Sequence, residues 1–248
     1  MIWKLEEDIA QASILDMRFW KISFTKLFSK PAKIIHPALS VPSFVDDCEG
    51  IDLDGSRIKS LLFSTDMALI ENSNADAVLA VYPFSPSPEI MKSLIDFSKK
   101  PVICGIGGGI TKGKAALKMA QTAEQLGAKA IIVNQPFPNH DIKILKANIR
   151  IPVISSVSTS NFDFRRRINA GIDYLHIAAG AASSQIIEHL KYHLPGFPVI
   201  ATGGSNLNDI KKTVQAGAKA IVLSPPSSKE LFRNIMDTYR KGINHLKK

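Results

Sequence analysis

Short apolar runs recur along most of the chain, and amphipathic stretches separate them. Three runs align without gaps, PVICGIGGG, PVISSVSTS and PVIATGGSN, and they begin at residues 101, 152 and 198. Four others alternate with them, ADAVLAVYP, AKAIIVNQP, IDYLHIAAG and AKAIVLSPP, beginning at residues 75, 128, 172 and 218. Each run is rich in Val, Ile and Ala, which is typical of a strand buried on both faces of a parallel sheet.

The stretches between these runs have helical character. Residues 111–126 carry apolar side chains at helical spacing and are followed by Gly127, while residues 206–216 are followed by Gly217. A glycine directly after such a stretch is typical of a helix C-terminus. Strands that alternate with helices at this spacing indicate right-handed βαβ units.

The repeat shows seven strands, and its spacing decides where the eighth lies. Both KIIHPALS (33–40) and SLLFSTD (60–66) precede the series. Counting back from residue 101 by the interval between the aligned runs leads to the fifties, close to Ser60. We therefore predict a first strand at 60–64 and a single-domain (β/α)₈ barrel over residues 59–248, favoured over an open doubly wound sheet.

Residues 1–58 lie outside the repeat. A loose apolar stripe with helical spacing runs through residues 9–28. It predicts a helical extension and loop packed on the barrel, where the helix plugs the barrel bottom or forms a homo-oligomer interface. The acidic stretch 46–57 lacks the spacing and the bidentate Glu of a calcium loop, so we interpret it as a solvated loop.

Composition narrows the class of protein. The chain has 248 residues, 45% of them hydrophobic, and 31 basic against 22 acidic side chains give a net charge of +9. Two cysteines, no basic-then-apolar leader and no apolar run of about 18 residues favour a cytoplasmic protein without a membrane span. Only residues 165–167 form a dense basic run and aromatic residues are few, so we expect a small anionic partner and no nucleic acid.

Residues 203–205 are the first candidate anion site. Active sites of such barrels lie at the carboxyl ends of the strands, and Gly203, Gly204 and Ser205 follow the seventh strand directly before a helix. Glycines let backbone N–H groups approach an anion, and the helix N-terminus adds a favourable dipole. The alternative is a tight turn without a ligand.

The end of the chain carries a family resemblance. FPVIATGGSNLNDIKKTVQAGAKAIVLSP (197–225) resembles the last units of the phosphate-binding (β/α)₈ superfamily, which includes thiamine phosphate synthase, phosphoribosylanthranilate isomerase, the histidine-pathway barrels and FMN oxidoreductases. The resemblance implies phosphate binding at the turn and leaves FMN open as a cofactor. One departure concerns the last strand, which these families follow with Gly-Ser or Gly-Thr. Here Ser224-Pro225-Pro226 follows, and because proline has no N–H, Ser227 would have to supply donors.

The loop after residue 105 is the second candidate anion site. Gly107, Gly108 and Gly109 could form a backbone nest, and Lys112 could reach the anion. The alternative is a flexible loop with a solvated lysine. A nucleotide P-loop is rejected because Ala115 stands where Ser or Thr would bind magnesium.

The remaining candidates are polar residues at strand ends. Asn134 would hydrogen-bond a substrate, and with Lys112 and Asp66 it makes the candidate catalytic set. A buried amide and a helix N-cap are the alternatives for Asn134 and Asp66. His176 is interpreted as a core histidine and Cys104 as a structural thiol. No strand ends in lysine, no two acids share neighbouring strand ends, and no cluster has metal-ligand spacing, so we expect no metal.

These observations favour an enzyme acting on a small phosphorylated or anionic metabolite, of lyase, isomerase or transferase type. An FMN-dependent oxidoreductase, a hydrolase and a non-catalytic metabolite-binding barrel are the alternatives.

Overall fold

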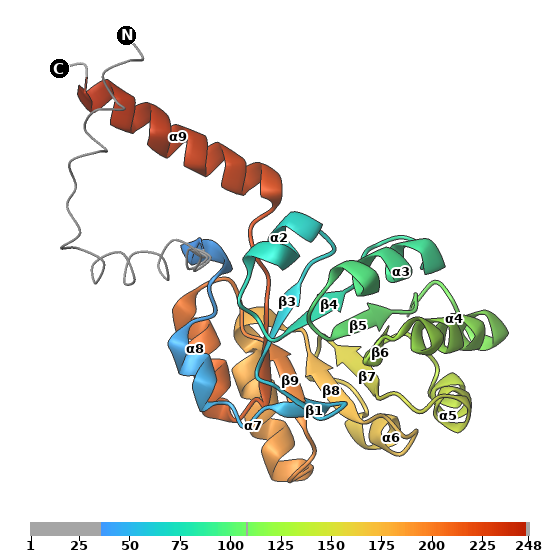
Figure 1. Ribbon diagram of the computed structural model, residues 1–248. Helices are drawn as coiled ribbons and strands as arrows, with labels where there is room; N and C mark the ends of the chain where they lie inside the picture. Colours follow the sequence, from blue (N-terminus) through green and yellow to red (C-terminus); the bar gives the residue numbers. More distant parts are fainter. Residues whose placement is uncertain (1–35, 108, 247–248) are drawn as a thin grey trace, which may run out of the picture. The chain divides into compact units, whose positions relative to one another are not determined.

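The computed structural model describes residues 36–107 and 109–246 of the chain, and these form a closed barrel of eight parallel strands (Figure 1). The hydrogen-bonded order around the barrel is β10-β3-β4-β5-β6-β7-β8-β9. The predicted (β/α)₈ barrel is therefore confirmed. The strands are β3 (Ser60–Phe63), β4 (Ala77–Ala80), β5 (Val102–Gly105), β6 (Ala130–Asn134), β7 (Val153–Val157), β8 (Tyr174–Ile177), β9 (Val199–Thr202) and β10 (Ala220–Leu223).

The choice of the first barrel strand is also confirmed. β3 pairs with β10 on one side and with β4 on the other, which closes the ring. The described part of the rejected candidate, 36–40, contains only the 3₁₀ helix η1 (Pro37–Leu39). The helical extension expected in the first part of residues 1–58 lies in residues 1–35, outside the described residues.

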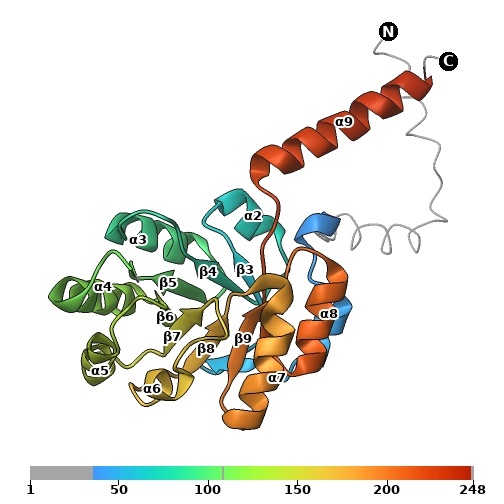
Figure 2. The same cartoon turned by 180° about the vertical axis from the view of Figure 1, so that it is seen from behind.

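Helices follow the strands around the outside of the barrel, and α7 and α8 pack side by side (Figure 2). Gly127 and Gly217 end two of the helices in the left-handed conformation, as the sequence predicts. None of the helices in the described part of the chain is long and apolar enough to cross a membrane. The helices are α2 (Met67–Asn72), α3 (Pro88–Phe97), α4 (Gly113–Leu126), α5 (Asn139–Asn148), α6 (Phe164–Ile168), η3 (Gly180–Ala182), α7 (Ser183–His193), α8 (Leu207–Ala216) and α9 (Ser228–Leu246).

A β-hairpin closes the bottom of the barrel, at the amino ends of the strands. Its strands are β1 (Ile51–Leu53) and β2 (Ser56–Ile58), and its side chains Ile51, Leu53 and Ile58 are buried in the apolar interior of the barrel. The interpretation of 46–57 as a solvated loop is therefore wrong. The apolar residues alternate with acidic ones that face solvent, so a two-residue period was present but hidden by the acidic composition.

A second segment, residues 36–48, covers the outer wall of the barrel between α2 and α8. Its 3₁₀ helix η2 (Ser43–Asp47) packs on α8, and in Figure 1 the segment appears in blue beside that helix. The Ser73 hydroxyl donates to the carbonyl of Leu39 at 3.1 Å, which fixes the segment to the end of α2. Leu39, Val45 and Cys48 are buried, so chain that precedes the barrel completes its outer layer.

Candidate active site

Four polar side chains line one half of the C-terminal mouth, which is the open end of the barrel at the carboxyl ends of the strands. The parallel register places Asn134 beside Ser156 and Ser156 beside His176. His176 pairs with Ile200, which faces the barrel interior, and Thr202 follows two residues later on the same face of β9. Together they form a polar wall across four consecutive strands, β6 to β9: Asn134, Ser156, His176 and Thr202.

His176 joins the two hydroxyls of this polar wall. Its Nδ1 is 3.0 Å from the Ser156 Oγ, and its Nε2 is 3.0 Å from the Thr202 Oγ1. The imidazole is only 5% exposed, and burial lowers its pKa to about 4. A neutral imidazole has one N–H donor and one acceptor nitrogen, so it receives a hydrogen bond from one hydroxyl and donates to the other. The three groups form one continuous chain of hydrogen bonds.

The interpretation of His176 as a buried histidine agrees with the structure, but the sequence analysis did not identify its two partners. A signal existed in the repeat, because Ser156 and Thr202 occupy the same position in two of the aligned runs, where the third has Gly105. Only the pairing of the neighbouring strands shows that both side chains face the same side as His176. The polar wall is therefore a finding of the structure.

The buried imidazole gives a prediction for stability against pH. In the unfolded chain His176 has its ordinary pKa near 6.5, whereas in the folded protein the pKa is about 4. The unfolded state therefore binds more protons as the pH falls from 7 to 4, and folding loses about 3 kcal/mol from this residue. Urea unfolding at several pH values should show a smaller loss towards acid in His176→Gln than in wild type. An equal loss of unfolding free energy towards acid in the two proteins would show that His176 keeps its ordinary pKa in the folded state.

The other half of the mouth is apolar. Phe63 pairs with Leu79 of the apolar interior and ends β3 at the mouth, where 41% of its surface is exposed. A cavity of about 110 Å³ lies at the carboxyl ends of the next strands, β4 to β6, with Val81, Tyr82 and Phe84 in its wall and Asn134 as a polar lining residue. A substrate with one apolar part and one oxygen-rich part would therefore be oriented by the mouth.

The turn between β9 and α8 (residues 203–205) has free donors. The N–H groups of Gly204 and Ser205 make no hydrogen bond to any other described residue. A Cβ on Gly203 would lie 2.7 Å from the Cα of Ile210, so this glycine allows α8 to pack closely against the turn. Gly204 has φ +92°, a conformation that side-chain-bearing residues rarely adopt. The fold of the turn thus accounts for both glycines, and it leaves the two backbone N–H groups without a partner among the described residues.

A cavity of about 790 Å³ lies beside this turn, with Gly204 and Ser205 in its lining. Thr202 of the polar wall is also one of the lining residues. Residues of the segment 37–42 and of α9 also contribute to the lining, so the cavity extends from the turn over the outer layer of the barrel.

Charges of both signs border this cavity. Arg233 and Glu230 of α9 both contribute to the lining, and the Asp209 carboxylate lies beside the turn, held by the Asn206 amide at 2.7 Å. An anion in this cavity would find N–H donors and a guanidinium within one space, with Asp209 at its edge.

Several of the other predicted anion-binding groups already have partners in the protein. The N–H groups of Gly109, Ile110 and Thr111 donate to the Gly107 carbonyl at 2.6–2.8 Å, so these three donors are already occupied within the loop. Gly108 lies outside the described residues. Ser227 donates through both its N–H and its hydroxyl to Glu230, each at 2.8 Å. The Gly107 N–H, in contrast, makes no hydrogen bond to another described residue, so it is the free donor in the described part of this set.

Two predicted catalytic residues lie at the starts of helices, outside the polar wall. Lys112 is exposed at the N-cap of α4, whose Gly113 N–H is bound by the Asp141 carboxylate at 2.8 Å. Asp66 is the N-cap of α2, where it accepts from the Ala68 N–H at 2.8 Å. A hydrogen bond from the Ser228 hydroxyl is the main reason that the pKa of Asp66 lies below its ordinary value. The structure brings Asn134, but not these two, into the polar wall.

The two cysteines are buried thiols. Burial raises the pKa of Cys104 to about 12 and that of Cys48 to about 11. Neither is a ready nucleophile at neutral pH. The interpretation of Cys104 as a structural thiol is consistent with this environment.

Comparison of the sequence with known proteins gives one distant relative, and no family model matches the chain. Over 134 residues the chain is 26% identical to thiamine-phosphate synthase of Staphylococcus saprophyticus. The aligned region spans 49% of this chain and 62% of that enzyme. The relative therefore does not assign the whole chain to its family.

Two similar solved structures are remote from this chain in sequence. Phosphoenolpyruvate phosphomutase from Streptomyces platensis has a TM-score of 0.57 at 15% identity, covering 76% of this chain and 82% of that one. Phosphonopyruvate hydrolase in complex with oxalate and Mg²⁺ has a TM-score of 0.56 at 14% identity, covering 79% and 84%. Among the described residues, no group of three or more His, Cys, Asp or Glu side chains is placed to hold a metal ion. What this chain shares with these enzymes is the (β/α)₈ barrel.

Proposed function

We propose that this protein is an enzyme that acts on a small phosphorylated or anionic metabolite at the C-terminal mouth of its barrel. The observation that carries the proposal is the hydrogen-bonded chain Ser156–His176–Thr202, because Thr202 is also among the residues that line the cavity beside the turn at 203–205. A group that can move protons therefore lies next to a group that can hold an anion.

The anion would be held by the backbone. The N–H groups of Gly204 and Ser205 and the N-terminus of α8 offer donors and a positive dipole end, and the Arg233 guanidinium adds charge. Arg233 would supply the contact that Pro225 and Pro226 cannot give through their backbone. Asp209 beside the turn would favour an anion that leaves room for its carboxylate.

The polar wall would carry out the proton transfer. If a substrate gives a proton to one hydroxyl, that hydroxyl passes its own proton to the acceptor nitrogen of the imidazole, and the opposite nitrogen releases its proton to the second hydroxyl. The second hydroxyl in turn gives its own proton to another atom of the substrate or to water. The histidine changes tautomer and stays neutral throughout, which its low pKa favours. Asn134 would hydrogen-bond a substrate carbonyl or hydroxyl. This chemistry suits a lyase, isomerase or transferase.

The similar proteins support the substrate class. Thiamine-phosphate synthase, phosphoenolpyruvate phosphomutase and phosphonopyruvate hydrolase are all named for phosphorus-containing anions. An FMN oxidoreductase, a hydrolase and a non-catalytic binding barrel remain alternative proposals. An FMN phosphate would use the same turn, so a yellow colour of the purified protein would favour the flavin alternative.

The anion site is tested by placing a negative charge in the turn. Ser205→Asp should weaken the binding of inorganic phosphate or of a sugar phosphate at least tenfold, because a carboxylate would repel the anion and compete for its donors. Ser205 is exposed, so the free energy of unfolding should change by less than about 0.5 kcal/mol. Isothermal calorimetry gives the affinity and thermal melting gives the stability.

Ser205→Asn is the matched control, since it has the same size without the charge and should bind within about threefold of wild type. Gly204→Asp is unsuitable, because the left-handed backbone and a Cβ only 3.1 Å from the Asp209 Cβ would add strain. Equal phosphate binding by wild type and Ser205→Asp would show that the anion does not bind at this turn.

A further inference from the structure

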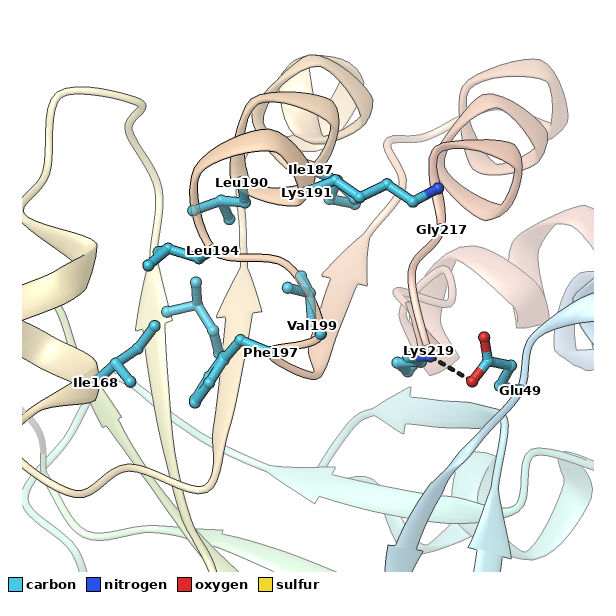
Figure 3. A pocket seen from close by; sticks show the side chains of 12 residues that line it. Glu49, Ile168, Ile187, Leu190, Lys191, Leu194, Phe197, Val199, Gly217 and Lys219 are labelled. Carbon is cyan, nitrogen blue, oxygen red and sulfur yellow. Dashed lines mark hydrogen bonds and ion pairs between the residues drawn. The ribbon is translucent and has the colours of Figure 1, made fainter.

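In addition to the two cavities described above, another cavity lies at the opposite end of the barrel, near the amino ends of β8 and β9 (Figure 3). Its volume is about 140 Å³. One side of it is formed by aliphatic and aromatic side chains from α6, α7, β9 and the connection between α7 and β9: Ile168, Ile187, Leu190, Leu194, Phe197 and Val199. Backbone and charged side chains form the rest of the lining. We call it the basal cavity.

Charged groups border the basal cavity on one side. Lys219 forms an ion pair with Glu49, and the hydrogen bond from Lys219 is the main reason that the pKa of Glu49 lies below its ordinary value. Lys191 extends from α7 towards Gly217, and its ammonium would lie 3.1 Å from a Cβ at that position (Figure 3). It makes no ion pair with any side chain that the structure describes. Two ammonium groups and one carboxylate thus lie at the border, which leaves it with a net positive charge.

We propose that the basal cavity is a binding site for a small aryl or alkyl carboxylate. The hydrocarbon part would fill the apolar space, and the carboxylate would remain at the border beside Lys191. The volume suits a single ring, since an engineered apolar cavity of roughly 150 Å³ binds benzene. The ammonium favours an anion over a neutral or cationic ligand of the same shape.

The walls determine the class of ligand. The six apolar side chains offer no hydrogen-bond donor or acceptor, so they suit the hydrocarbon part of a ligand, whereas its polar group would lie at the border beside the charged side chains. A benzoate-like molecule needs a polar partner only at its carboxylate. The cavity beside the turn at 203–205, in contrast, has free backbone donors and hydroxyls in its lining. The proposal for the basal cavity is independent of the enzyme activity proposed above.

Benzoate is the probe for the test, with benzene and benzylamine as neutral and cationic analogues of similar shape. Calorimetry and thermal melting of the full chain should show that benzoate binds more tightly than either analogue. Lys191→Met should weaken benzoate binding about tenfold and leave benzene binding unchanged, because it removes one charge-assisted contact and keeps an apolar side chain. Lys191 is exposed, so the variant should fold as wild type does.

Two further variants locate the probe. Leu194→Trp should fill the basal cavity and abolish the binding of both benzoate and benzene, whereas Ser205→Asp at the mouth should bind benzoate as wild type does. If Leu194→Trp fails to fold, Lys191→Met still provides the comparison between benzoate and benzene. The proposal is overturned if benzoate does not bind or if Ser205→Asp abolishes benzoate binding. It is also overturned if Lys191→Met lowers the affinities for benzoate and benzene equally, or lowers neither.

Discussion

His176→Gln should lower kcat/KM for the phosphorylated or anionic substrate by about 10²- to 10⁴-fold, the range typical of losing a positioned acid–base group. Glutamine can still accept from one hydroxyl and donate to the other, so it preserves the hydrogen bonds to Ser156 and Thr202. An amide does not exchange its proton between two sites as a neutral imidazole does. The substitution therefore removes proton transfer while it keeps the architecture.

The measurement is steady-state kinetics on the substrate that a screen of phosphorylated metabolites identifies, with phosphate affinity measured in parallel. Ser156→Ala and Thr202→Val each interrupt one end of the chain and should lower kcat more than they raise KM. Phosphate should bind to His176→Gln as to wild type, because the turn at 203–205 is unchanged. Activity within threefold of wild type would show that His176 only fills space.

Leu53→Ala should destabilise the fold by about 2–5 kcal/mol, as for other fully buried leucines. Leu53 has no exposed surface and belongs to the hairpin that closes the bottom of the barrel. The alanine would leave a cavity among the side chains of the barrel interior, which a closed ring of strands cannot easily collapse to fill. For a protein of this size the melting temperature should fall by roughly 5–15 °C.

Urea unfolding and thermal melting of Leu53→Ala check this, with Ser56→Ala as the control. Ser56 lies in the same hairpin but is exposed and should change stability by less than about 0.5 kcal/mol. Equal stability of the two variants would mean that the hairpin is not part of the cooperative structure.

Much of the architecture could be predicted from the sequence, because the strands of a parallel barrel are buried on both faces and their composition shows it directly. The spacing of the repeat was sufficient to place β3 at Ser60–Phe63. The hairpin was missed because each of its strands has only three residues, too few for an alternation to stand out among four aspartates at 46–54.

The active-site prediction was less complete for a different reason. Glycines and hydroxyls at strand ends are visible in the sequence, but whether their donors are free depends on distant residues. Asp141 binds the Gly113 N–H across 28 residues, and His176 lies between hydroxyls 20 and 26 residues away. Such partners follow from the register of neighbouring strands and from loop conformation, which a single sequence does not encode locally.

The segment that precedes the barrel has a consequence for the order of events during synthesis. Gly50 donates its N–H to the Lys219 carbonyl at 2.8 Å, and Glu49 pairs with the same lysine 170 positions later in the chain. While the ribosome is still adding the middle of the chain, residues 36–58 lack their partners in α8 and β10. Leu39 can already bind the end of α2 through Ser73, but the apolar side chains of the hairpin are fully covered only when β10 closes the ring. Contacts at such separations slow folding. A nascent chain halted before β10 should therefore expose the apolar surfaces that chaperones recognise.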